Sequence, residues 1–472
     1  MEGPSNSLLI RGCEVAGRIA DVRIVAGRIS ALGRLETTPG EPVLNGRGGA
    51  LLPGLHDHHL HLLSLAASLD SVRCGPPEVR DVRGLQAALG AATEKGWIRG
   101  VGYHESVAGD LDRRSLDRFI SRVPARLQYR NGARWVLNTA AVEALGLDNG
   151  LDVKGLERDP QGRATGRLHR LDGWLRERLP QNIPPLAPVG QMLSKYGVTG
   201  ATDATPDNGP EALRALEHAV QRGEIALNLR VMGMADLPEA GAQRVCRGEV
   251  KILLEERALP RFEDLVEKIR RVHQVGRCIA VHCVTRTELV VATTAIREAG
   301  AFPGDRVEHA AIASPDLVEL LVCAGVAVVT QPNFVRERGD QYLCDVEKRD
   351  LPWLYRCAGL ESAGVPVGGG TDAPFGDPDP WLAMQAAVDR RTQAGAELGR
   401  EEAVTPERAL ELFTTPLSAP GGRPRRVHPG VPADLCLLSI PWRRARDHLA
   451  ASDVVATLVA GRVARGKCEL NG

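Results

Sequence analysis

Residues 53–63 read PGLHDHHLHLL and place four histidines and one aspartate within residues 56–61. We expect this stretch to end a buried strand, in which alternate side chains share a face. His59 and His61 then point the same way, whereas His56 and His58 face away from them. Because two histidines on one face are also compatible with hydrogen-bonded core residues, a metal site would need further ligands from other strands.

Strand and helix patterns alternate through the centre of the chain, which indicates a parallel sheet with crossover helices. Together with the histidine stretch, eight strands suit a closed (β/α)8 TIM barrel. The other seven are expected at residues 197–205, 227–234, 249–255, 278–284, 306–313, 325–333 and 364–374.

The two ends of the chain share another pattern. Both consist of short apolar stretches separated by glycine and proline turns, which is typical of antiparallel strands joined by hairpins. We therefore predict one small β-sandwich lobe built from both termini, residues 1–52 and 421–472. The metal-binding barrel would take residues 53–74 and 190–420.

Residues 75–189 are too long to be a loop between the first two barrel strands. They contain the helical patterns SLDRFISRV and LNTAAVEALG and the turn-rich ERDPQGRATGRL. We predict an inserted α+β subdomain that covers the barrel mouth. Its candidate substrate contacts, for each of which a structural role is the alternative, are Tyr103, His104, Trp135 and His169.

Three more candidate ligands lie at the expected carboxyl ends of barrel strands, where enzymes of this fold build their sites. They are His282 in AVHCV, His309 in RVEHA and Asp372 in GGGTDAP. With His59 and His61 they offer nitrogen and oxygen atoms from four strands, a set that suits zinc or another borderline divalent ion.

Lys251 is unusual because VKILL places an ammonium group in an apolar strand, where burial without a partner costs several kcal/mol. Its side chain could reach the barrel rim or pair with Glu255. Alternatively, burial keeps the amine neutral enough to add CO2, and the resulting carbamate bridges two metal ions as a carboxylate would. The other five ligands favour the carbamate.

These motifs, DHHLH at 57–61, VK at 250–251, VHC at 281–283, EHA at 308–310 and GTDAP at 370–374, resemble those of the metal-dependent amidohydrolase superfamily. The tail, TPERALEL followed by HPGVPADLCLL, is similar to that family's passage from the last barrel helix into its β-sandwich. The insertion, with GWIRGVGY, NGARWVLNTAAVEALG and DPQGRATGRL, resembles the YtcJ-like branch that includes N-substituted formamide deformylase. The resemblance spans nearly the whole chain.

The resemblance implies a binuclear centre with zinc as the expected ion. His59, His61 and Asp372 would hold the more buried metal, His282 and His309 the second, and carbamylated Lys251 would bridge them. The chain departs from the branch at Ala133, where a histidine is usual, and at LLEERALPRFED, which replaces a longer segment rich in glycine and serine. Both regions should border the substrate, so the resemblance supports the metal chemistry rather than a named substrate.

Such a centre predicts a hydrolase that cleaves an amide-type C–N bond with a metal-bridging hydroxide. The positive charge of two divalent ions would exceed the negative charge of the ligands and the hydroxide. The site would therefore stabilise an oxyanion. Asp372 would shuttle the proton to the leaving nitrogen, and Asp57 would orient a ligand imidazole. A deaminase of the same fold, releasing ammonia, and a catalytically silent scaffold are the alternatives.

Composition limits the partners. Lys plus Arg equals Asp plus Glu at 59 each, without a block of like charge, which argues against nucleic acid and membrane surfaces and favours a small-molecule substrate. We find no signal peptide or apolar run that could span a bilayer, and the ten cysteines show no CxxC pair, so we expect a cytoplasmic protein. A homo-oligomer remains an open option.

Overall fold

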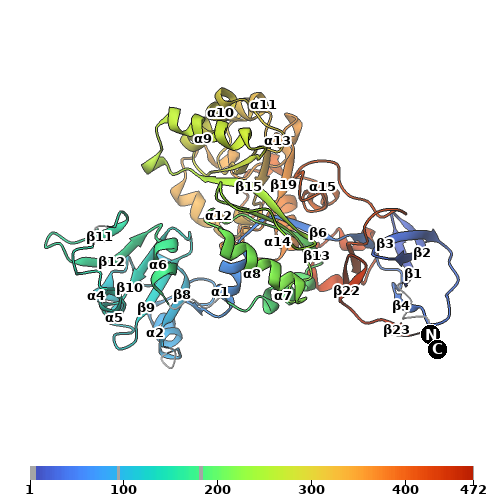
Figure 1. Ribbon diagram of the computed structural model, residues 1–472, viewed down its shortest axis with the longest axis horizontal. Coiled ribbons are helices and arrows are strands. Elements are labelled where there is room, and N and C mark those ends of the chain that lie inside the picture. Colours follow the sequence, from blue (N-terminus) through green and yellow to red (C-terminus); the bar gives the residue numbers. More distant parts are fainter. Residues whose placement is uncertain (1–6, 93–95, 152, 180–183, 471–472) are drawn as a thin grey trace. The chain divides into compact units, whose positions relative to one another are not determined.

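The predicted barrel strands follow one another along the chain and in space. The computed structural model describes residues 7–92, 96–151, 153–179 and 184–470. One sheet contains eight parallel strands, each hydrogen-bonded to the next in chain order (Figure 1). They are β6 (Leu55–Leu60), β13 (Val198–Asp203), β14 (Asn228–Gly233), β15 (Val245–Leu253), β16 (Ile279–Cys283), β17 (Arg306–His309), β18 (Ala327–Thr330) and β19 (Val367–Gly369).

The first strand, β6, meets the segment after the last strand, β19. The backbone N–H of Asp372 donates to His59 O at 2.7 Å, and that of His61 donates to Ala373 O at 2.8 Å. Gly370 permits this approach, since a Cβ there would lie 2.8 Å from the backbone nitrogen of His59. The sheet therefore closes almost completely on itself, and the predicted (β/α)8 barrel is confirmed.

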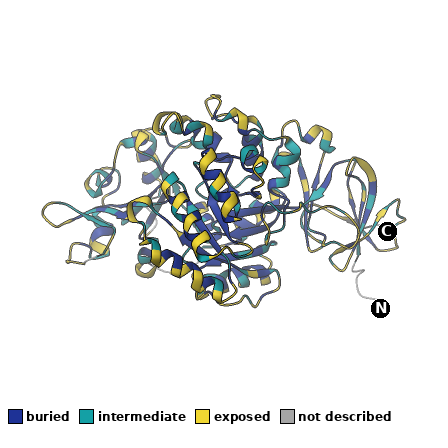
Figure 2. Cartoon of the chain, turned by 90° about the horizontal axis from the view of Figure 1, so that it is seen from above, coloured by how far each residue is buried: buried dark blue, intermediate teal, exposed yellow. Residues whose placement is uncertain are grey.

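Helices cover the outside of the barrel and turn their apolar side toward it. In Figure 2 the barrel strands are buried and the surrounding helices expose one side. The principal ones are α7 (Ala187–Lys195), α8 (Pro210–Gln221), α9 (Phe262–Gln274), α10 (Arg286–Ala299), α11 (Pro315–Ala324), α12 (Asn333–Asp345), α14 (Pro380–Asp389) and α15 (Pro406–Leu412). In α9, Leu265, Val266, Ile269 and Val272 are buried at helical spacing. No helix within the described residues is long and apolar enough to cross a membrane.

A β-sandwich lobe combines strands from both ends of the chain, as predicted. One sheet has the order β23-β4-β1-β2-β3 and the other β22-β21-β20-β5. Their shared core contains Ile10 and Leu44 from the beginning of the chain and Leu435 and Leu458 from its end. The strands are β1 (Ser7–Val15), β2 (Arg18–Val25), β3 (Arg28–Gly33), β4 (Pro42–Asn45), β5 (Leu51–Pro53), β20 (Leu435–Leu438), β21 (Val454–Val459), β22 (Arg462–Arg465) and β23 (Glu469–Leu470).

The inserted segment forms a compact unit of its own, residues Leu63–Pro185, while the barrel and the sandwich belong to the other unit. It begins before the predicted residue 75 because β7 pairs with β8 in the insertion's sheet. That sheet has the order β11-β12-β10-β9-β8-β7, which confirms an α+β insertion. Its strands are β7 (Val72–Arg73), β8 (Ile98–Tyr103), β9 (Ala125–Tyr129), β10 (Arg134–Leu137), β11 (Leu156–Arg158) and β12 (Ala164–His169), and its longer helices are α2 (Val82–Gly90), α5 (Thr139–Ala144) and α6 (Asp172–Arg178). Its cover over the barrel mouth stays a prediction.

The composite sandwich core makes a testable prediction. Ile10 is fully buried in it, whereas Ile19 on the neighbouring strand is 67% exposed. We expect Ile10→Ala to lower the free energy of unfolding by about 2–5 kcal/mol, because it removes buried carbon atoms and leaves a cavity. Ile19→Ala should change it by about 0.5 kcal/mol or less. Denaturant unfolding measures both, and equal effects would argue against a shared core.

Candidate metal centre

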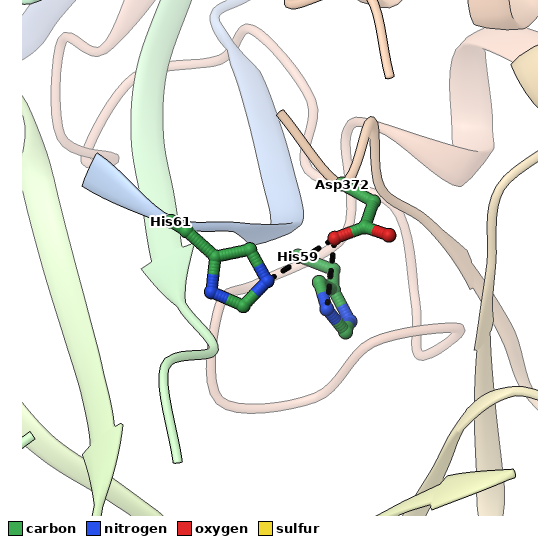
Figure 3. Close-up of side chains that lie close together, drawn as sticks. All are labelled: His59, His61 and Asp372. Atoms are coloured by element: carbon green, nitrogen blue, oxygen red, sulfur yellow. Dashed lines mark hydrogen bonds and ion pairs between the residues drawn. The ribbon is translucent and has the colours of Figure 1, made fainter. Parts of the chain in front are cut away.

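Three predicted ligands converge at the carboxyl ends of the first and last barrel strands. Asp372 Oδ1 lies 3.1 Å from His61 Nε2 and 3.5 Å from His59 Nε2 (Figure 3). The ligand atoms of the three residues all lie within 4.8 Å of one another. The spacing is short enough for one ion to contact all three side chains.

Side chains of β6 alternate between two faces, which explains which of its histidines belong to the candidate centre. His59 and His61 face Asp372, as predicted from their spacing. His56 and His58 instead contact Thr415: His56 Nδ1 lies 2.8 Å from its carbonyl oxygen, and His58 Nε2 lies 2.9 Å from its hydroxyl. These two histidines therefore anchor the segment that follows α15 and are outside the centre.

Within the described residues Asp57 hydrogen-bonds to backbone N–H groups and a hydroxyl but to no imidazole, so the prediction that it orients an imidazole is wrong. Its Oδ1 accepts the backbone N–H of His59 at 3.0 Å and of Thr371 at 3.1 Å, and its Oδ2 accepts the Thr371 hydroxyl at 2.5 Å. The carboxylate therefore ties β6 to the segment after β19, just before each supplies a ligand.

His309 and His282 extend the cluster from β17 and β16. The His309 ring centroid lies 4.8 Å from that of His59 and 4.6 Å from that of His282. His309 Nδ1 donates to Gln331 Oε1 at 2.6 Å, which leaves Nε2 as the acceptor. His309 and Asp372 have left-handed backbones, with φ of 71° and 56°. Such strain in non-glycine residues is typical of functional sites.

Lys251 lies in the barrel wall beside these histidines. It pairs in register with Ala280, and His282 follows two positions later on the same face of β16. The side chain is 6% exposed, and no hydrogen-bond acceptor is found for its buried Nζ within the described part of the chain. The alternative in which Lys251 reaches the barrel rim is therefore wrong. Burial lowers the pKa of its ammonium group, and the nearby Glu308 carboxylate opposes this shift.

Comparison with known proteins places the chain in a family. The sequence profile of the amidohydrolase family matches residues 43–465. The chain belongs to the amidohydrolase family. Membership makes it a hydrolase that acts on carbon–nitrogen bonds and implies a divalent metal.

Similar proteins are distant in sequence. This amidohydrolase is 24% identical to N-substituted formamide deformylase of Arthrobacter pascens, over 93% of this chain and 94% of that one. It is 23% identical to the putative amidohydrolase YtcJ of Bacillus subtilis, over 78% and 79%. An uncharacterized metal-dependent hydrolase from Pyrococcus horikoshii has a similar fold, with a TM-score of 0.73 at 20% identity over 92% of this chain and 97% of that one.

Sequence analysis missed the group that holds His59. Glu308 Oε2 lies 2.5 Å from His59 Nδ1, so Nδ1–H donates to the carboxylate and Nε2 stays free on the side of Asp372. Burial, together with the nearby Lys251 charge, lowers the pKa of His59 to about 3, although the Glu308 carboxylate opposes this shift. The imidazole is thus neutral near pH 7, as metal ligation requires.

Glu308 ends a chain of buried charges inside the barrel. Arg306 Nε donates to Glu308 Oε1 at 2.6 Å, and Arg306 Nη1 lies 3.7 Å from Glu249 Oε1. Arg230 Nε contacts both oxygens of Glu249 at 3.0 Å. The sequence carries a signal for these buried charges. Glu249 with Lys251, and Arg306 with Glu308, are charged pairs two residues apart in apolar strands.

The four candidate substrate contacts lie in the separate inserted unit. Tyr103 is 0% exposed and donates to Gly109 O at 2.6 Å, and Trp135 is 2% exposed and donates to Asp172 Oδ1 at 2.8 Å. Their burial speaks against a substrate contact. His104 caps the short helix α3 (Glu105–Ala108) by accepting from Ser106 N, and His169 is half exposed near Glu157. For these two histidines the predicted contact stays a prediction.

The bond between Glu308 and His59 predicts a change in metal affinity. We expect Glu308→Gln to weaken metal binding by about 10–100-fold, because the carboxylate fixes the tautomer and orientation of His59. Competition with a chromogenic chelator measures it. Glu249→Gln is the matched control: it also leaves an arginine of the buried chain with less charge compensation, and so should lower thermal stability, but it touches no imidazole. Equal loss of affinity in both variants would contradict the role of Glu308.

Proposed function

We propose that this amidohydrolase cleaves an amide-type C–N bond of a small molecule by means of two divalent ions, with zinc as the expected metal. One observation carries the proposal: His59, His61 and Asp372 bring their ligand atoms within 4.8 Å of one another at the end of the barrel where sites of this fold form. His282, His309 and Lys251 adjoin them and would complete the ligand set. When bound, such ions polarise a carbonyl group and make water a nucleophile near neutral pH.

The residues present suit these ions. The imidazoles of His59 and His309 are buried, their pKa values are lowered by burial, and Nδ1 of each donates to an oxygen acceptor. Both therefore offer a neutral Nε2, the form in which histidine binds a metal. Nitrogen ligands with one carboxylate are typical of zinc centres.

Lys251 supports a bridging carbamate. Its Nζ is buried and has no hydrogen-bond partner within the described residues, so an ammonium group there would lack an acceptor for its N–H groups. As a neutral amine it can attack CO2, forming an N–C bond and releasing a proton, which leaves an anionic carbamate with two oxygens. That anion would satisfy the buried position and supply a bridging ligand.

Asp372 is suited to move the proton. Burial would raise the pKa of its carboxyl group, but the hydrogen bond with His61 and the nearby His59 and His309 imidazoles hold the pKa well below its usual range. It is therefore ionised at neutral pH. A carboxylate in this position can take a proton from the attacking water and pass it to the leaving nitrogen.

We expect Asp372→Asn to lower kcat by about 100- to 10,000-fold, because the amide cannot accept the proton. Elemental analysis should still find metal held by the remaining ligands. Asp377→Asn changes an exposed carboxylate in the same loop and should leave kcat unchanged. Turnover of Asp372→Asn within a few-fold of the wild type would contradict the assignment.

Lys251→Met should lose the carbamate and retain less metal. After incubation with 13C-labelled bicarbonate, NMR should detect a carbamate carbonyl in the wild type and none in Lys251→Met. Lys268→Met, which removes an exposed lysine of α9, should keep both the signal and the metal content. The carbamate assignment fails if the wild type shows no signal at full metal content.

A screen of N-acyl, N-formyl and cyclic amides tests the reaction. Release of a carboxylate and an amine supports the proposal, whereas ammonia released from an amidine-type or heterocyclic carbon would indicate a deaminase of the same fold. Purified protein that takes up no stoichiometric metal would point to a catalytically silent scaffold.

A further inference from the structure

A cationic side chain lies next to the candidate metal centre. Arg338 is on α12, which follows β18 at the carboxyl end of the barrel. Its Nη2 donates to the carbonyl oxygen of Phe375 at 2.6 Å, and Phe375 belongs to the same loop as Asp372. The Phe375 ring lies 5.4 Å from the His61 ring. Arg338 is therefore anchored to the loop that supplies a ligand.

An aromatic ring packs against this guanidinium. Its carbon lies 3.7 Å from the centre of the Phe334 ring. Beyond it, the hydroxyls of Tyr342 and Tyr355 lie 3.3 Å apart. Burial alone would lower the pKa of Arg338, but Tyr342, Tyr355 and Asp372 raise it above its ordinary value. The side chain is a permanent positive charge in a partly apolar wall.

Within the described residues, no carboxylate lies within 4.0 Å of the Arg338 guanidinium to form an ion pair. The adjacent Glu337 carboxylate instead accepts the Asn333 side-chain N–H and the Asp377 backbone N–H, each at 3.0 Å. Arg338 is only half-buried, and a guanidinium has five N–H donors, so donors remain for another acceptor.

Three other buried arginines of the barrel unit have stronger partners than Arg338. Arg306 and Arg356 each have a carboxylate oxygen within 2.7 Å, and Arg390 donates to four backbone carbonyl groups. The Phe334 face stabilises part of the Arg338 charge, but it leaves N–H donors of the guanidinium without an acceptor. A planar carboxylate that meets its paired N–H groups would remove this cost.

We propose that Arg338 binds a carboxylate on the substrate, so that the preferred substrates are N-acyl or N-formyl compounds with a carboxylate near the scissile C–N bond. This inference rests on the proposed function and specifies its substrate class. The Tyr342 and Tyr355 hydroxyls can supply a further hydrogen bond, since one hydroxyl proton of the pair is not used between them.

Matched substrate pairs test the proposal. N-acetyl and N-formyl amino acids are compared with N-acyl alkylamines of the same skeleton, in which a methyl group replaces the carboxylate. We expect the metal-loaded wild type to prefer the carboxylates. Arg338→Met should lower kcat/KM for them by about 100-fold, mainly through KM, and change the neutral partners by about 3-fold or less. Arg338→Lys should recover part of the preference.

Arg336→Met is the matched control, because Arg336 is exposed on the same helix. It should leave both substrate classes unchanged. The inference is overturned, while the proposed function stands, if the wild type hydrolyses both members of each pair equally well. An equal loss for both members in Arg338→Met would also overturn it.

A binding experiment separates the two proposals. Calorimetry of the metal-loaded protein with straight-chain alkyl carboxylates and the corresponding alcohols requires no turnover. Carboxylate binding that Arg338→Met abolishes supports the inference even if no amide is hydrolysed, a result that would count against the proposed function alone. Carboxylate binding that survives the substitution belongs to the metal ions and overturns the role of Arg338, as does a lack of binding to the wild type.

Discussion

The carboxylate of Asp57 holds the two ends of the barrel wall together. It accepts one N–H from β6 and a backbone N–H and a hydroxyl from Thr371, after the last strand. His59 follows Asp57 two positions later, and Asp372 directly follows Thr371. The bonds that close the barrel therefore also set the distance between its first and last candidate ligands.

A connected set of buried charges leads through the barrel to the candidate site. Glu249, Arg306 and Glu308 are each at most 1% exposed, and they connect Arg230 to His59. Because the desolvation cost of buried charges offsets much of their mutual attraction, these ion pairs fix the position of His59 more than they add to the stability of the fold. Glu308 accepts a hydrogen bond from Nδ1 of His59, which leaves Nε2 available to bind a metal ion. The left-handed backbone of His309 and Asp372 is a second local cost that the surrounding packing sustains.

The two sides of the candidate site have different chemistry. One side collects imidazoles and a carboxylate around a buried lysine, which suits cations. The other side presents Arg338 on an aromatic wall, which suits an anion. Arg338 lies on α12, in the connection between β18 and β19. Connections at the carboxyl ends of barrel strands vary between enzymes of this fold and set their specificity.

Periodicity along the chain was sufficient to predict the eight barrel strands and the sandwich from both termini, and residue types at the strand ends indicated His59, His61 and Asp372, which the structure brings together. These features follow from local rules: side chains alternate in strands, and parallel strands direct their carboxyl ends to one side. Partners across the barrel could not be predicted in this way. Which imidazole Glu308 holds, which backbone groups Asp57 joins and whether Arg338 meets a carboxylate depend on residues far apart in the chain. Only the closed barrel brings those residues within hydrogen-bond distance, because register and side-chain orientation are set by packing and not by the neighbouring sequence.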